Sequence, residues 1–274
     1  MSRLRGGSAG AARGAASFLT ETVSRVRAAG ATGQLTVRAD SAFYSKMVLA
    51  TAAKFDVQFS ITARQDKRIR AAIDAIEESA WQPIPYWLST PEVSGADIAE
   101  TAFTVFASDK RHARQVRLVV RLVVRRVRPT PGSQLALFTD WDYHAFVTDR
   151  TLPLAEVEAD HRRHAIVEQS RAEQSIAELK SAGLAYMPSG NFMANAAWLA
   201  LTVMAHNLGR AVGQLAGPDL DTATAATLRR KVFTMPGRLV HSGSRRHLRL
   251  PTSWPWADAI SNALERITAI PQRC

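Results

Sequence analysis

A strand–helix–strand pattern over residues 35–62 constrains the fold of this chain more than any other feature of its sequence. Residues 35–37 form a β-prone run that leads to Asp40, and residues 44–54 have the periodicity of a helix. In the next segment apolar and polar residues alternate, the apolar ones being Phe55, Val57, Phe59 and Ile61. Two strands joined through a helix form a parallel pair with a right-handed crossover, which is typical of α/β proteins.

Asp40 stands at the carboxyl end of the first of these strands. Open α/β sheets bind their ligands at this edge, so the position suits a catalytic or metal-binding carboxylate. A structural interpretation is equally open at this point, because aspartate and serine also end strands and cap helices, as Asp40 and Ser41 could do.

The residue pattern becomes strand-like after a helical segment at residues 66–76 and three prolines, Pro83, Pro85 and Pro91. Alternation in residues 116–127 predicts a strand with valine and leucine on one face. The arginines that punctuate its other face are Arg117, Arg121 and Arg125. Residues 140–147 alternate in the same way and predict the partner strand. Such an arginine face is either solvated or in contact with phosphate.

Helical periodicity dominates the chain after residue 150. The pattern predicts a helix over residues 154–180, ended by Gly183, and an apolar helix that begins at Phe192. A shorter helix is expected at residues 18–27. Beyond Gly217 the chain is rich in proline and basic residues, and we expect a loosely packed tail.

Positive charge is concentrated in two segments. The chain has 35 Lys or Arg and 24 Asp or Glu residues, a net charge of +11. Residues 111–128 hold seven arginines and no acid, and residues 221–274 hold nine basic residues against three acidic ones. Arginine pairs well with phosphate, so nucleic acid is the expected partner, although an arginine-rich codon bias would give the same composition. The candidate contacts with DNA are Arg117, Arg121, Arg125, Arg126, Arg229, Arg230, Lys231, Arg245 and Arg246.

Several classes of protein are excluded by composition. The single cysteine, Cys274, rules out a disulfide framework and a cysteine-based zinc site. The most apolar stretch, residues 192–208, is interrupted by polar residues and is expected to be a core helix instead of a membrane span. No apolar segment follows the N-terminal arginines as in a signal peptide. We expect a cytoplasmic protein without membrane contact.

Four segments resemble DDE-type bacterial insertion-sequence transposases, and the similarity covers nearly the whole chain. They read LTVRADSAFYS at residues 35–45, HRRHAIVEQ at 161–169, EQSIAELK at 173–180 and GLAYMPSGNFMANAAWLAL at 183–201. The resemblance implies a ribonuclease-H-like α/β core with an inserted β-rich subdomain and C-terminal helices. It also implies cleavage and strand transfer at the ends of an insertion sequence in double-stranded DNA.

In that family three carboxylates hold two Mg²⁺ ions, which activate the nucleophile and stabilise the leaving oxygen. Asp40 matches the second aspartate, and Asp40 with Glu173 is the implied metal-binding pair. The first aspartate has no counterpart, because Glu21 is the only acidic residue before Asp40 and lies in a helix-like run. We therefore expect a truncated core that lacks its first strands, with exposed apolar faces and unpaired strand edges.

The glutamate has two candidates. His161 and His164 stand seven and four residues before Glu168 on one helical face, where the family carries supporting tyrosine and arginine residues. Lys180 instead stands seven residues after Glu173. Both matches cannot share one face, because Lys180 follows Glu168 by twelve residues, a rotation of about 120°. The motif EQS occurs twice, at residues 168–170 and 173–175, and indicates a five-residue duplication within the helix. Glu173 is favoured by its unbroken continuation into the next helix. A zinc site at the two histidines is not expected, since partner ligands are lacking.

The resemblance divides the chain into four regions. Residues 1–64 form a partial core, 65–150 the inserted β-rich subdomain, 151–216 the catalytic-helix region and 217–274 a basic C-terminal tail. Two functions remain open. The chain is either a Mg²⁺-dependent DNA transposase or a non-catalytic DNA-binding remnant, which could act on an intact transposase; a decayed product without function is a third interpretation.

Overall fold

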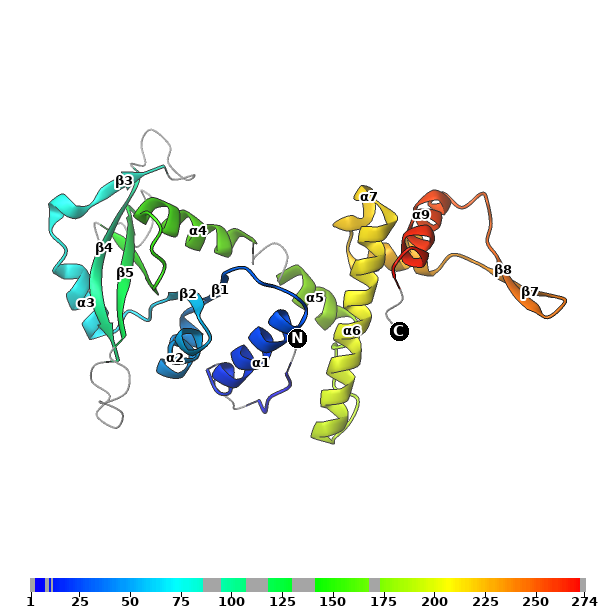
Figure 1. Cartoon of the computed structure of the whole chain (residues 1–274), viewed down its shortest axis with the longest axis horizontal. Helices are drawn as coiled ribbons and strands as arrows, with labels where there is room; N and C mark the ends of the chain where they lie inside the picture. Colours follow the sequence, from blue (N-terminus) through cyan, green and yellow to red (C-terminus); the bar gives the residue numbers. More distant parts are fainter. Residues whose placement is uncertain are drawn as a thin grey trace. The chain divides into compact units, whose positions relative to one another are not determined.

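The computed structural model describes residues 3–7, 10, 12–85, 95–106, 118–129, 141–167 and 173–271. The chain divides into two compact units (Figure 1). The first comprises Gly6–Glu168 and is called the sheet unit below. The second comprises Gln169–Cys274 together with Met1–Arg5 and is called the helical unit.

A six-stranded mixed sheet forms the centre of the sheet unit (Figure 1). Its order is β1-β2-β6-β5-β4-β3; β1 and β2 are parallel and every other pair is antiparallel. The strands are β1 Leu35–Ala39, β2 Val57–Thr62, β3 Gln82–Ile84, β4 Ala96–Val105, β5 Leu118–Val127 and β6 Asp142–Thr148. The predicted parallel pair and the predicted pairing of the arginine-bearing strand with the next strand are both confirmed.

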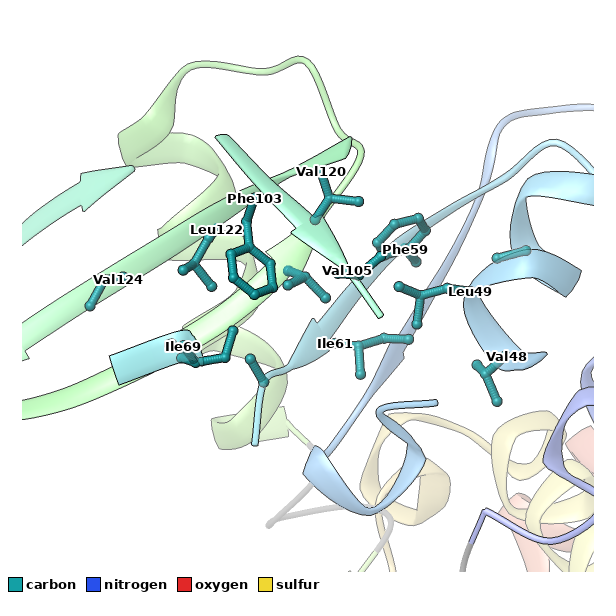
Figure 2. Close-up of a cluster of buried hydrophobic side chains, with 14 of the residues drawn as sticks. Val48, Leu49, Phe59, Ile61, Ile69, Phe103, Val105, Val120, Leu122 and Val124 are labelled. Carbon is teal, nitrogen blue, oxygen red and sulfur yellow. The ribbon is translucent and has the colours of Figure 1, made fainter. Parts of the chain in front are cut away.

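Three helices cover one face of the sheet, namely α1 Ala15–Ala28, α2 Lys46–Lys54 and α3 Lys67–Asp74. Side-chain caps begin the second and third, since Ser45 Oγ accepts from the Val48 N–H and Asp66 Oδ1 accepts from those of Arg68 and Ile69. Figure 2 shows Leu49 of α2 and Ile69 of α3 packed with side chains of the sheet. This layer is the main hydrophobic core of the unit.

The opposite face of the sheet is far more polar, because side chains alternate between the two faces of each strand. Leu122 and Val124 of β5 enter the main core, while Val123 packs with Phe146 and with Val157 of α4 Leu154–Val167. The remaining residues of that second face include Arg38, Ser60, Thr62, Arg121, Arg125 and Thr148, as the strand registers show. Helix α4 therefore covers a layer of charged and hydroxyl groups.

Strands on both sides of the predicted boundary at residue 64 belong to one sheet, since β6 pairs with β2 on one side and with β5 on the other. The hydrogen-bonded ladder thus joins the inserted segment to the strand–helix–strand core. The helix expected over residues 154–180 is described in two parts, α4 and α5 Glu173–Ser181. The duplicated text falls at the junction, where residues 168–172 lie outside the described part of the chain.

The helical unit is built around α6 Phe192–Ala216, which Asn191 caps by accepting from the N–H groups of Met193 and Ala194. Short elements follow: α7 Pro218–Asp221, α8 Ala225–Leu228, a π-turn Arg229–Phe233, the hairpin strands β7 Arg238–Ser242 and β8 Arg245–Arg249, and α9 Ala257–Thr268. No helix within the described ranges is long and apolar enough to cross a membrane.

The expectation of a loosely packed tail beyond Gly217 is wrong for its helical parts. Leu220, Leu228 and Ala263 are buried together with Ala216 of α6 in a small core. A Cβ at Gly213 would lie 2.8 Å from the Leu220 carbonyl oxygen, so this close approach requires glycine. Elements of four residues are too short to show a helical period in the sequence, which explains why they were not predicted.

Candidate functional site

Asp40 lies directly after β1, at the strand end that its sequence position predicts. Its Oδ1 accepts a hydrogen bond of 2.8 Å from the Ala42 N–H and caps the short 3₁₀ turn Ser41–Phe43. The structural interpretation of Asp40 is therefore realised in the fold. Oδ1 is thus occupied by the cap. Asp40 is exposed, and its Oδ2 is the oxygen that could bind a ligand.

His161 of α4 lies against the same edge of the sheet. Its Nδ1 is 2.7 Å from Ser60 Oγ and its Nε2 is 3.3 Å from Thr62 Oγ1, while its ring stacks on Phe146 at 3.9 Å between centroids. The parallel register pairs Ala39 with Ile61, so its continuation places Asp40 beside Thr62. The helix thus presents an imidazole to the strand end that carries Asp40.

Asp160 is a carboxylate of this site that the sequence analysis missed. Its Oδ2 lies 2.9 Å from Arg150 Nη2 and 3.2 Å from Arg38 Nη2, and its Oδ1 lies 3.6 Å from Arg163 Nη1. The hydrogen bond from Arg150, with the nearby positive charges, holds the pKa of Asp160 below its ordinary value. A carboxylate neutralised by three guanidinium groups is a poor ligand for a cation.

The predicted catalytic residues are distributed over both units. Asp40 belongs to the sheet unit, whereas Glu173 begins α5 of the helical unit and Lys180 lies in its last turn. Glu168 lies outside the described residues, and His164 lies in α4 without a described side chain. Seven residues separate Glu173 from Lys180, so both are on one face of α5.

The donor groups do not assemble a magnesium site in the part of the chain that the structure describes. No three His, Cys, Asp or Glu side chains are grouped there so that they could hold a metal ion. Asp160, a carboxylate of α4 on the polar face of the sheet, is already held by three arginines. The described set does not fit two bound Mg²⁺ ions, which require several oxygen ligands.

The arginines of β5 have carboxylate partners within the sheet unit. Arg121 Nε donates to Glu100 Oε2 at 2.6 Å, and Arg125 Nη1 donates to Glu158 Oε1 at 2.7 Å. Glu158 is only 1% exposed. Arg117, which was predicted with them, lies outside the described residues. Arg121 and Arg125 therefore have a structural role in the layer between the sheet and α4. The sequence predicted only a contact with DNA for them.

Arg126 points to the other face of β5 and is enclosed by two carboxylates and two indole rings. Its Nε donates to Asp97 Oδ2 at 2.9 Å and its Nη1 to Glu78 Oε2 at 2.8 Å. The guanidinium carbon lies 4.4 Å from the ring centre of Trp81 and 4.3 Å from that of Trp141. These contacts raise the pKa of Arg126 and lower the pKa of Glu78. Arg126 is thus buried in the fold.

The basic residues of the helical unit differ in their surroundings. Arg229 and Arg230 of the π-turn and Arg245 and Arg246 of β8 are exposed. Lys231 is half-buried, with its Nζ 5.2 Å from the ring centre of Trp256. Among the described residues predicted to contact DNA, these four arginines are the exposed ones, whereas Arg121, Arg125 and Lys231 are half-buried and Arg126 is buried.

The mixed sheet with its flanking helices is consistent with the ribonuclease-H-like fold of DDE enzymes. The family model described as Transposase DDE domain group 1 matches residues 1–272. The chain therefore belongs to this family of DDE-type transposases, as the sequence resemblance implied. No curated protein matches the chain. The family implies a DNA substrate and the use of a divalent metal ion.

Proposed function

We propose that the chain acts on the ends of an insertion sequence as a DNA transposase domain. The observation that carries the proposal is Asp40 at the carboxyl end of a parallel strand, with His161 of α4 in contact with Thr62 at the end of the neighbouring strand. The loops beyond the carboxyl ends of strands are where α/β proteins build their sites. Asp40 and either Glu168 or Glu173 are the proposed catalytic carboxylates, with His161, His164 and Lys180 as supporting residues at the DNA phosphate.

A further carboxylate is needed, and β1 offers the place for it. β1 is an edge strand of the described sheet, with β2 as its neighbour. Its other edge presents N–H and C=O groups that can pair with an additional strand. A parallel strand added there would end beside Asp40, so a carboxylate at its end would meet Asp40. We propose that such a strand, supplied from outside the described residues or by another polypeptide, completes the site and its affinity for Mg²⁺.

A cleavage assay tests this proposal. The full chain is incubated with Mg²⁺ and a duplex that carries the element ends, and the rate of strand nicking is compared with that of Asp40→Asn. Asparagine caps a helix as well as aspartate does, so the variant should fold normally. We expect a rate at least about 100-fold lower, because misplacing a catalytic group by about 1 Å already costs that much. Asp74→Asn, a change of an exposed carboxylate at the end of α3, is the matched control.

A second function, DNA binding without catalysis, is favoured by the donor groups that the structure describes. They include no group of three side chains placed to hold a metal ion. A DNA-binding protein of this kind would bind duplex with a steep dependence on salt, show no nicking with Mg²⁺, and lower the activity of an intact transposase when mixed with it. Nicking that depends on Asp40 would contradict this alternative, and binding without nicking by the wild type would contradict the catalytic proposal.

A further inference from the structure

The hairpin β7–β8 is an isolated two-stranded ribbon in the helical unit. Its strands pair antiparallel, with Ser242 opposite Arg245 across the turn Gly243–Ser244. Gly243 has a φ of +60°, as glycine adopts at the first position of a two-residue hairpin turn. Among the described strands, β7 and β8 pair only with one another. All five residues of β8 are exposed, and Figure 1 shows the ribbon extending away from α6 and α9 of the same unit.

The hairpin carries positive charge without any compensating carboxylate. It contains Arg238, Arg245, Arg246 and Arg249 together with two histidines, and no acidic residue occurs between Asp221 and Asp258. None of these four arginines forms an ion pair with a described carboxylate of the chain. The arginines of β5, in contrast, each have such a partner. The residues that the structure describes therefore leave the charge of the ribbon without a neutralising carboxylate.

The register of the hairpin brings like charges together. Arg238 lies directly opposite Arg249, so two guanidinium groups are neighbours across the ribbon. Like charges in this arrangement destabilise a strand pair, and an isolated hairpin is at best marginally stable in water. The Leu239–Leu248 pair is exposed and adds little burial. A polyanion bound along the ribbon would remove the repulsion, so the ribbon is better suited to a bound state than to a free one.

Alternation sorts these charges onto two faces. Residues opposite each other share a face, so Arg238, Arg249 and Arg245 lie on one face, and Arg246 with the leucine pair lies on the other. Arg245 and Arg249 are four residues apart, a separation of about 13 Å along a strand. One face of the ribbon therefore presents three guanidinium groups over a length comparable to several phosphates of a duplex.

From this geometry we propose that β7–β8 is a duplex-binding ribbon, which contacts DNA phosphates through Arg238, Arg245 and Arg249. The inference rests on the proposed function, because it takes DNA as the polyanion. A two-stranded ribbon fits the major groove, which is about 12 Å wide. Single-stranded DNA is bound mainly by stacking of bases on aromatic side chains, and residues 238–249 contain no Phe, Tyr or Trp. The ribbon binds double-stranded DNA independently of the strand end at Asp40.

The experiment measures binding of the full chain to a labelled duplex of about 30 base pairs, at salt concentrations from about 50 to 200 mM. In the triple variant Arg238→Gln, Arg245→Gln, Arg249→Gln, the slope of log affinity against log salt should fall by about 2.7, since each phosphate contact contributes about 0.9. Affinity at low salt should fall at least about 30-fold. The corresponding triple lysine variant should retain most of the slope, because it keeps the point charges.

The matched control removes the same number of charges from exposed residues of the sheet unit, by Arg64→Gln, Lys67→Gln and Arg70→Gln. It should change the slope by less than about 0.5. An unchanged slope in the hairpin variant, an equal loss in the control, tighter binding to single strands than to duplex, or the absence of salt-dependent duplex binding by the wild type would each overturn the inference.

The proposed function is tested separately in the same preparation. If Asp40→Asn abolishes nicking but the hairpin variant binds duplex like the wild type, the proposal for the ribbon is wrong and the transposase function is supported. If the hairpin variant loses binding while the wild type never nicks DNA, the proposal for the ribbon is supported and the proposed catalytic function is contradicted.

Discussion

The arginines of β5 and those of the hairpin β7–β8 both belong to basic segments of the sequence, but their surroundings in the fold differ. Arg121, Arg125 and Arg126 pair with carboxylates from β4, α4 and the segment after α3. The hairpin arginines are exposed, and Arg238 lies opposite Arg249 across the ribbon. A cluster of positive charge in a sequence is therefore a surface for an anionic partner only where the fold supplies no anion of its own.

The largest effect is expected from Arg126→Met in the sheet unit. The variant leaves Asp97 and Glu78 without their cation and removes the contacts with Trp81 and Trp141. Leaving the mostly buried Asp97 without its cation costs about 3–5 kcal/mol, so the free energy of unfolding should fall by about 4 kcal/mol, and the exposed Glu78 adds little to this loss. Urea unfolding measures it, and Arg246→Met on the hairpin should stay within about 0.5 kcal/mol. Similar losses at both sites would break the comparison.

The next effect concerns Arg125 and Glu158. Arg125→Met leaves a carboxylate that is 1% exposed without this partner and should cost about 3 kcal/mol. Combining it with Glu158→Gln should cost less than the sum of the single changes by at least about 1 kcal/mol, because the two side chains interact directly. A double-mutant cycle from urea unfolding curves gives the coupling. Additive losses would show that the ion pair does not hold α4 to the sheet.

A smaller effect is expected in the pH dependence of stability. The pKa of Asp160 is lowered by Arg150, so its contribution is present above the ordinary carboxyl pKa of about 3.9 and is lost as the pH falls through the folded value. Burial raises the pKa of Asp149, so its contribution has the opposite sign and is lost as the pH rises through the folded value.

Unfolding measured between about pH 3 and 7 separates these two contributions. The difference in stability between the wild type and Asp160→Asn should shrink as the pH falls. For Asp149→Asn the difference should shift in favour of the variant as the pH rises. The hairpin variant without Arg238, Arg245 and Arg249 should follow the wild-type curve, since these arginines form no ion pair with a carboxylate of the described ranges. Parallel curves for all variants would contradict the assignments.

The smallest effect is expected within the hairpin itself. Arg238→Thr removes the like-charge pair with Arg249 and should stabilise the ribbon by up to about 0.5 kcal/mol at low salt. The gain should shrink as salt screens the charges. Amide exchange of Val240 and His247 on the paired strands measures it. Faster exchange in the variant would show that the cross-strand arginines do not repel.

Local pattern was sufficient for much of the sheet unit. A β-prone run predicted β1, and alternation predicted β2 and the pairing of β5 with β6, because side chains of a strand alternate between a buried and a less buried face. It did not predict that β6 lies between β2 and β5, since strand order depends on pairing between distant segments. The division at residue 64 therefore crosses a continuous ladder of hydrogen bonds.

The candidate site shows the same limit. The position of Asp40 after a strand was predictable from residues near it in sequence, and so was its capacity to cap the following turn. Asp160 was missed because its meaning depends on Arg38 and Arg150, which reach it from the sheet. His161 was chosen for its spacing from Glu168, whereas the structure places it on Ser60 and Thr62.

The sequence alone determined the family, the strand–helix–strand core and the residues available for chemistry, because these depend on local periodicity and on short sequence motifs. Only the tertiary structure decided which charges are paired. Arg38 and Asp160 are 122 residues apart, and Arg126 and Glu78 are 48 apart. The physical reason is that an ion pair forms between side chains that are close in space, and sequence separation carries no information about that distance.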